Sequence, residues 1–295
     1  MAIKPGDIVG RKSYGCDVLF KVCDIEENRN EEKTVLLKGI NVRLLADSPE
    51  ADLVLMSEEE VEKDKEVFAR KFEESDRSMT RSMTRKKRGS GGRQGLNGFM
   101  QPGRVLHLDG DGEYLKLCLK EYEKMGIGAF GYEIKESEQY KHIKRLLREI
   151  KPDILVVTGH DGLLKDSNDL NDINSYRNSY NFVLSVKAAR EVQPSLDELI
   201  IIAGACQSHY EAILESGANF ASSPNRILIH ALDPVKACIK AALTPINKIV
   251  SAEEISKLTI SGINGIGGLQ TRGKYRDGAP KPRYKYKQGG DVHEV

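Results

Sequence analysis

The sequence lacks long hydrophobic runs and has no excess of charge of either sign. No apolar segment approaches the ~18 residues of a membrane-spanning helix, so the chain is not expected to cross a membrane. Lys and Arg total 45 against 44 for Asp and Glu, and a net charge of +1 gives no overall field that would attract nucleic acid or a membrane surface. The N-terminal residues also lack the basic and then apolar pattern of a signal peptide, which predicts a cytoplasmic protein.

Cysteine is scarce and widely spaced. The five cysteines are odd in number and never form a Cys-x-x-Cys pair. This spacing argues against a disulfide framework and against a zinc knuckle. We therefore expect free thiols, no metal site and no cofactor.

The first third of the chain divides into two parts. Residues 1–56 contain short alternating apolar runs between turn formers, which predicts a small SH3-like β-barrel that serves as an interaction or targeting module. Basic and aromatic residues are not interleaved there, which argues against nucleic acid as a partner. Residues 57–103 begin with a helical run capped by Ser57 and continue as a basic, glycine-rich stretch, which predicts a mobile linker.

Strand and helix patterns alternate four or five times in residues 104–269. Apolar runs near residues 105–108, 127–134, 155–158, 199–203 and 218–221 predict strands, and amphipathic segments between them predict helices. This alternation is typical of an α/β domain with a doubly wound, mainly parallel sheet. Residues 270–295 are basic and rich in Gly, Pro and Tyr, which predicts an irregular tail.

Two of the predicted strands stop at a reactive side chain. One apolar run leads to His160, and another leads to Cys206. Open parallel sheets place their sites at the carboxyl ends of the strands. If these two strands are neighbours, His160 and Cys206 lie side by side, as a Cys-His nucleophile pair requires.

Such a pair suits acyl transfer, most simply peptide hydrolysis. An imidazolium or the start of the helix predicted from Ser208 would lower the pKa of the Cys206 thiol. Main-chain N–H groups of Asp161 or Gly162, together with that of Cys206, could face a developing oxyanion. His209 and His230 compete with His160 for the role of base, although neither ends a strand.

An apolar strand followed by His-Gly, and another followed by Ala-Cys, resembles the caspase, clostripain and legumain clan of cysteine proteases. Here Asp161 stands between His160 and Gly162, which departs from the clan pattern. The sequence also resembles, from end to end, a family of sporulation-specific proteases, in the run at 4–15, in Thr158-Gly-His-Asp-Gly162 and in Ala203-Gly-Ala-Cys-Gln-Ser-His-Tyr210.

The resemblance implies a caspase-like fold and a cysteine endopeptidase that cleaves spore coat and related spore proteins. It implies a place in the mother-cell cytoplasm, with association with the forming coat, and catalytic roles for Cys206 and His160 with Asp161 beside them. Asp161 could orient the imidazole, bind a basic substrate side chain or cap the following loop. Some members of the clan cleave after arginine, and the tandem Arg-Ser-Met-Thr repeat suggests self-cleavage after Arg77, Arg81 or Arg85.

Two other classes of function remain open from the residues alone. Asp109 and Asp111 follow a predicted strand and suit a metal-dependent phosphoryl-transfer enzyme, although such carboxylates are more often turn formers or helix caps. A coat adaptor without catalytic activity would use the barrel and the basic linker instead. The oligomeric state cannot be predicted from these patterns.

Overall fold

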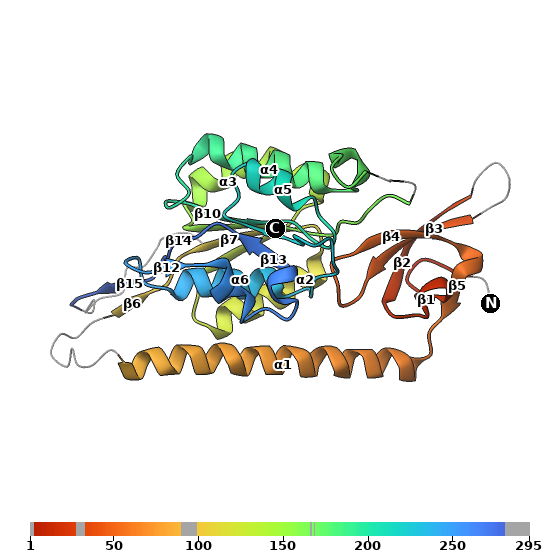
Figure 1. Cartoon of the computed structure of the whole chain (residues 1–295), viewed down its shortest axis with the longest axis horizontal. Helices are drawn as coiled ribbons and strands as arrows, with labels where there is room; N and C mark the ends of the chain where they lie inside the picture. The colour runs from red at the N-terminus through yellow and green to blue at the C-terminus, as the bar shows by residue number, and fades with distance from the viewer. Residues whose placement is uncertain (1–2, 28–32, 90–98, 166, 168, 281–295) are drawn as a thin grey trace, which may run out of the picture.

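A computed structural model describes residues 3–27, 33–89, 99–165, 167 and 169–280. A small antiparallel sheet lies at one end of the molecule, a larger central sheet forms its body, and one long helix runs along the side (Figure 1). None of the described helices is long and apolar enough to cross a bilayer.

The N-terminal part forms a five-stranded antiparallel sheet with the order β4-β3-β2-β1-β5. Its strands are β1 (Ile8–Arg11), β2 (Leu19–Glu27), β3 (Lys33–Gly39), β4 (Leu45–Pro49) and β5 (Leu53–Leu55). The alternation of apolar and polar residues places Val35 and Leu37 of β3 on the buried face. The short strands are confirmed; the likeness to an SH3 barrel stays a prediction.

Helix α1 (Glu58–Gly89) follows this sheet and is 32 residues long. Ser57 caps it as predicted, because its hydroxyl accepts the Glu60 N–H while the Glu60 carboxylate accepts the Ser57 N–H. The helix continues through the Arg-Ser-Met-Thr repeat, where the sequence suggested a linker. Arg, Lys, Met and Glu are good helix formers, and the Phe68 ring stacks on His230 at 4.3 Å, which holds the helix against the body.

The central sheet has six strands in the order β13-β11-β10-β9-β7-β8. These are β7 (Val105–Asp109), β8 (Ala129–Glu133), β9 (Ile154–Thr158), β10 (Ile200–Ala203), β11 (Phe220–Ser222) and β13 (Ile266–Gly268). All neighbours are parallel except β13, which runs antiparallel to β11. The predicted mainly parallel α/β sheet is thus confirmed.

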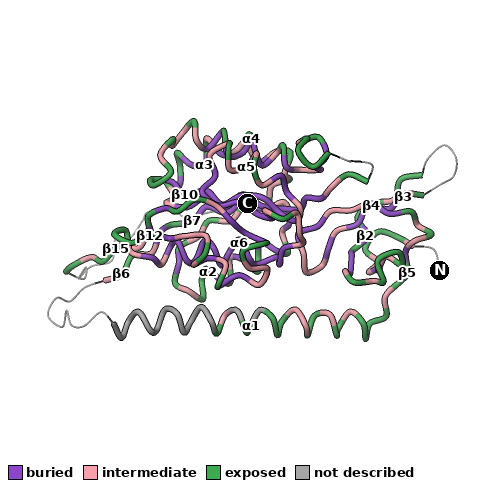
Figure 2. The backbone as a smooth tube through the Cα atoms, viewed as in Figure 1, coloured by how far each residue is buried: buried purple, intermediate pink, exposed green. Residues whose placement is uncertain are grey.

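Helices cover both faces of this sheet and bury its strands (Figures 1 and 2). One face packs against α2 (Gly112–Lys124), α6 (Asp233–Leu243) and α7 (Ala252–Ser256). The other packs against α3 (Glu136–Ile150), α4 (Ser179–Val192) and α5 (Tyr210–Glu215). Short 3-10 helices lie at η1 (Lys12–Tyr14), η2 (Glu50–Asp52), η3 (Ile173–Ser175) and η4 (Gly262–Asn264).

Four short strands form two further pairs. In one pair, β12 (Ile249–Val250) lies beside β14 (Thr271–Arg272); in the other, β6 (Phe99–Gln101) lies beside β15 (Arg276–Gly278). The start of the expected irregular tail therefore contains two strands, because its main-chain groups find partners in earlier parts of the chain. The remainder of that tail, 281–295, lies outside the described residues.

Candidate active site

The strands that end at His160 and Cys206 are neighbours in the central sheet. β9 and β10 pair in parallel, with Val157 opposite Ala203. The segments that follow the two strands therefore leave the sheet at the same edge. The pairing of these two strands is as the apolar runs predict, and direct contact between the His160 and Cys206 side chains stays a prediction.

The turn that carries Cys206 is tight. Gly204 and Gln207 on either side of it adopt positive φ angles of 104° and 54°, and the Ser208 hydroxyl accepts the Ala205 N–H at 2.9 Å. Helix α5 begins at Tyr210. Each of these features fixes the main chain around Cys206.

Cys206 is fully buried, and its sulfur faces Ile229. The Ile229 N–H donates to Sγ at 3.2 Å, while Sγ lies 3.6 Å from the Ile229 carbonyl oxygen. Burial raises the pKa of the Cys206 thiol to about 12, against the lowering effect of the Ile229 N–H. The sequence suggested a lowered pKa; in this closed arrangement the thiol is instead held neutral.

The His160 ring is 3% exposed and lies between aromatic and charged groups. The Tyr114 ring stacks on it at 5.4 Å, and Nε2 lies 3.6 Å from Asp111 Oδ2. Nε2 has no hydrogen-bond partner within the described part of the chain. Burial, followed by the positive charge of Lys38, lowers the pKa of His160 to about 3, so the imidazole is neutral.

Asp161 supports the loops around Cys206. Its carboxylate accepts hydrogen bonds from the Ser179 and Ser208 hydroxyls at 2.6 and 2.8 Å and from the Asn178 and Gly162 N–H groups. Within the described residues, the carboxylate next to the imidazole is that of Asp111 instead. The contacts of Asp161 thus correspond most closely to the loop-capping alternative.

A loop of the N-terminal sheet enters the active-site edge. Residues 40–44, between β3 and β4, lie across the ends of β9 and β10. The main-chain oxygen of Arg43 accepts hydrogen bonds from the N–H groups of Cys206 and Asp161, both at 3.2 Å. These two donors converge on one carbonyl, as the donors of an oxyanion hole do.

The predicted donor Gly162 has another role in this arrangement. Its N–H donates to the Asp161 carboxylate, so the donor beside Cys206 is the Asp161 N–H. A Cβ on Gly162 would lie 2.3 Å from the main-chain oxygen of Leu45. Glycine is therefore required at this position for the close approach of the loop.

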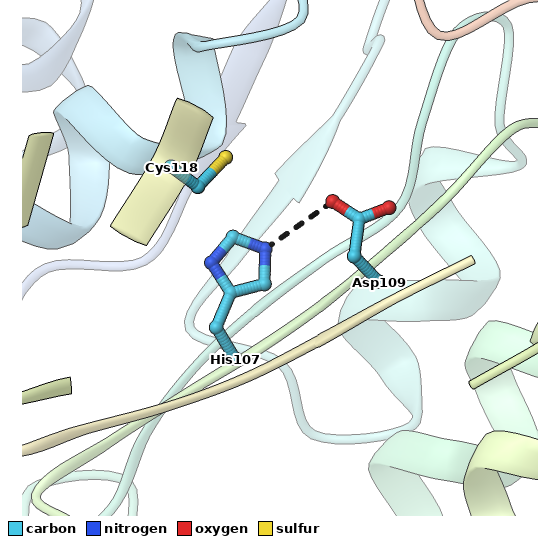
Figure 3. Close-up of side chains that lie close together, drawn as sticks. All are labelled: His107, Asp109 and Cys118. Carbon is cyan, nitrogen blue, oxygen red and sulfur yellow. Dashed lines mark ion pairs between the residues drawn. The ribbon is translucent and has the colours of Figure 1, made fainter. Parts of the chain in front are cut away.

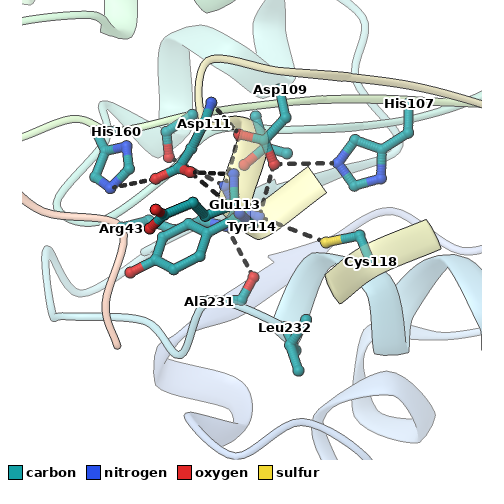
Figure 4. Close-up of polar contacts among 12 residues, drawn as sticks. Arg43, His107, Asp109, Asp111, Glu113, Tyr114, Cys118, His160, Ala231 and Leu232 are labelled. Atoms are coloured by element: carbon teal, nitrogen blue, oxygen red, sulfur yellow. Dashed lines mark hydrogen bonds and ion pairs between the residues drawn. The ribbon is translucent and has the colours of Figure 1, made fainter. Parts of the chain in front are cut away.

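The Arg43 side chain fills a closed pocket behind this carbonyl (Figure 4). Its guanidinium donates to both Asp109 oxygens, at 3.1 and 2.9 Å, and to the Ala231 and Gly159 carbonyl oxygens. Burial opposes the charge of Asp109, but Arg43 and then His107 hold the pKa of Asp109 well below its usual range. The pocket therefore binds a guanidinium through a buried bidentate ion pair.

The sequence matches the family model described as YabG peptidase U57 over residues 4–280. The chain belongs to the YabG peptidase family. It is 41% identical over 291 residues to the sporulation-specific protease YabG of Bacillus subtilis (strain 168), an alignment that covers 95% of this chain and 99% of that protein. Membership of the YabG family makes the chain a peptidase, which favours neither the phosphoryl-transfer nor the adaptor alternative.

The carboxylates of the phosphoryl-transfer alternative have other roles in this YabG family member. Asp111 is the N-cap of α2, where it accepts the Glu113 and Tyr114 N–H groups, and Asp109 binds Arg43. His107, Asp109 and Cys118 do place possible metal ligands within 4.8 Å of one another (Figure 3). The guanidinium of Arg43 lies against two of them and supplies the positive charge there.

The other predicted residues make no hydrogen bond to the Arg43 carbonyl among the contacts of the described residues. His209 caps α5 and contacts the Asn171 carbonyl oxygen at 3.0 Å, while His230 stacks on Phe68. Arg77, Arg81 and Arg85 lie within α1. The sequence patterns did not single out Arg43 or Tyr114 as site residues. For Arg43 the reason is that no local pattern marks a loop residue whose partner, Asp109, lies 66 positions away.

Proposed function

We propose that this YabG family peptidase is a cysteine endopeptidase that cleaves after arginine, with Cys206 as nucleophile and His160 as base. The observation that carries the proposal is the position of Arg43. Its carbonyl oxygen accepts hydrogen bonds from the Cys206 and Asp161 N–H groups, and its guanidinium binds Asp109. A substrate arginine bound in the same way would offer its carbonyl carbon to the nucleophile.

The reaction would proceed through an acyl-enzyme. Cys206 Sγ, turned from Ile229 toward the substrate, adds to the carbonyl carbon while His160 takes the thiol proton. The two N–H donors stabilise the oxyanion, each worth on the order of 10²- to 10³-fold in rate. His160 then protonates the leaving amine, and water hydrolyses the thioester. Asp111, 3.6 Å from Nε2, would stabilise the imidazolium.

The pocket supports arginine over lysine and over apolar residues. Asp109 presents both oxygens to a planar guanidinium, which lysine cannot bind in the same bidentate way. An apolar side chain would leave the buried Asp109 charge without a partner, which costs several kcal/mol. We therefore expect kcat/KM to be higher for peptides with arginine before the cut bond than for peptides with lysine or an apolar residue there.

The proposed setting of the reaction is sporulation. The name of the Bacillus subtilis relative supports a role in sporulation. We propose that the substrates are spore coat and related spore proteins, cut in the mother-cell cytoplasm or at the forming coat. No metal or cofactor enters the proposed reaction.

Peptides that differ only in the residue before the cut test this function. Wild type, Cys206→Ala and His160→Ala are compared on peptides with Arg, Lys or Leu at that position and on a spore-coat extract. We expect only the wild type to produce new termini, each preceded by arginine. Equal activity of Cys206→Ala would contradict the assigned nucleophile, and cuts after unrelated residues would contradict the assigned pocket.

A further inference from the structure

The bond between Arg43 and Leu44 lies where a substrate's scissile bond would lie. The Arg43 carbonyl faces the two oxyanion donors, and its side chain fills the Asp109 pocket. We propose that the β3–β4 loop is a built-in substrate and that the enzyme cleaves its own chain between Arg43 and Leu44. This inference rests on the proposed function and adds the substrate and the bond.

The main chain on both sides of this bond is also bound as a substrate would be. Before the bond, the Asn41 carbonyl oxygen accepts the Ala231 N–H at 3.2 Å. After it, the Leu45 N–H donates to the Asp161 carbonyl oxygen at 2.9 Å, and Leu44 forms a parallel bridge with Asp161. Such pairing of a chain with the edge of a binding site is a general mode of peptide recognition.

Internal contacts hold the loop in this position. The Gly39 N–H donates to the Leu44 carbonyl oxygen at 2.9 Å, and Tyr114 Oη donates to the Gly39 carbonyl oxygen at 2.9 Å. Asn41 Nδ2 binds the Asp64 carboxylate of α1 at 2.5 Å. Because β3 and β4 belong to the same chain as the site, the loop reaches the site without a diffusional encounter. It therefore also excludes other substrates until it is cut or displaced.

The proposed cleavage consumes one water molecule and regenerates the Cys206 thiol. Cys206 Sγ adds to the Arg43 carbonyl carbon, and the thiol proton passes through His160 to the Leu44 nitrogen as the C–N bond breaks. Water then adds to the thioester. The products are the regenerated thiol, a carboxylate at Arg43 and an amino group at Leu44.

The bonds after Arg77, Arg81 and Arg85 are poorer candidates for the first cut. All three residues lie in α1, whose main-chain groups bond within the helix. A peptidase that pairs with an extended chain would have to unwind the helix first. The β3–β4 loop needs no such rearrangement.

The test is N-terminal sequencing and intact-mass analysis of the purified full chain over time, at two concentrations 100-fold apart. An arginine peptide is added in parallel, as a separate readout of the proposed function. The variants are Cys206→Ala, Arg43→Gln, Leu44→Pro and the triple variant Arg77→Gln, Arg81→Gln, Arg85→Gln. Leu44→Pro keeps the buried arginine but makes the bond a prolyl bond, and melting curves establish that each variant is folded.

We expect fragments 1–43 and 44–295 from the wild type and the triple variant, at a rate independent of concentration, and none from the other three. Turnover of the arginine peptide while Arg43–Leu44 stays joined, or termini only at Ser78, Ser82 or Lys86, would overturn the inference and leave the proposed function standing. If only Arg43→Gln cuts the peptide, the loop is an inhibitor and not a substrate. If neither the wild type nor Arg43→Gln cuts it, the proposed function itself fails.

Discussion

Asp109 carries the charge recognition of the proposed site. Both of its oxygens bind the Arg43 guanidinium, and neither residue is exposed to solvent. Removing one partner of a buried ion pair costs about 3–5 kcal/mol, since the other charge stays buried without compensation. For Asp109→Asn we therefore expect kcat/KM on arginine peptides to fall by on the order of 10²- to 10³-fold. Glu113→Gln, an exposed neighbour, is the matched control, and unchanged arginine cleavage by Asp109→Asn would refute the pocket assignment.

We expect His160 to make the folded protein sensitive to acid. Its pKa of about 3 in the folded protein lies below the ~6.5 of an unfolded histidine, so its contribution to stability is complete above ~6.5 and is lost as the pH falls toward 3. Lys38 and Arg43 face the ring and oppose its protonation, while Asp111 favours it. In a Cys206→Ala background, which stays uncut, we expect the melting temperature to fall between pH 7.5 and pH 5.

Adding His160→Gln to that background isolates the histidine. The double variant retains every other titrating group and lacks only this imidazole. We expect its melting temperature to fall by less over the same pH range. An equal fall in the two proteins would show that other groups carry the acid sensitivity.

Single elements differ in how well the sequence predicts them. β9 and β10 follow from uninterrupted apolar runs, and their parallel pairing brings His160 and Cys206 to one edge. Helix α1 exceeds its predicted length, and the Arg and Met residues of the repeat, with the Lys and Arg residues after it, are good helix formers. The apolar residues of 42–46 predict a strand, whereas 40–44 form the loop between β3 and β4. Its place in the active site depends on contacts between distant parts of the chain, which local patterns do not encode.

The turn after β9 offers a test of the loop's contact beyond the scissile bond. A Cβ at Gly162 would meet the Leu45 main-chain oxygen at 2.3 Å, and a backbone atom cannot move aside cheaply. For Gly162→Ala we expect self-cleavage to slow at least tenfold. Arginine derivatives with a small amine leaving group have no residue at that position, so their turnover, measured after the loop has been cut, should stay within about twofold. Gly128→Ala, where nothing lies within 4 Å of the added Cβ, is the control. If both reactions slowed equally, the substitution would be acting on Cys206 and not on the contact with the loop.

At the level of the whole molecule, the N-terminal sheet and the active site share one core. Val9, Phe20 and Leu37 of the sheet belong to the same buried cluster as Cys206 and Ile229. The sequence suggested a separate interaction or targeting module. Shared burial with Cys206 supports a further role, in which the sheet presents the β3–β4 loop to the proposed site.

This shared core predicts the behaviour of the cut chain. The proposed cut separates β1, β2 and β3 from β4 and β5, yet β3 pairs with β4 from Thr34–Pro49 to Lys38–Leu45 and β1 pairs with β5. Breaking one loop bond leaves this ladder and the core in place, so fragments 1–43 and 44–295 should stay bound. We expect them to co-elute with the uncut Cys206→Ala protein in size-exclusion chromatography and to separate only in denaturant.

The new carboxylate of Arg43 would remain near the oxyanion donors, so activity on added peptides should rise only after a lag. The lag should be shorter at a denaturant concentration that loosens the N-terminal sheet without unfolding the rest of the protein. Release of fragment 1–43 under native conditions would show instead that the sheet depends on the intact loop for its hold on the site.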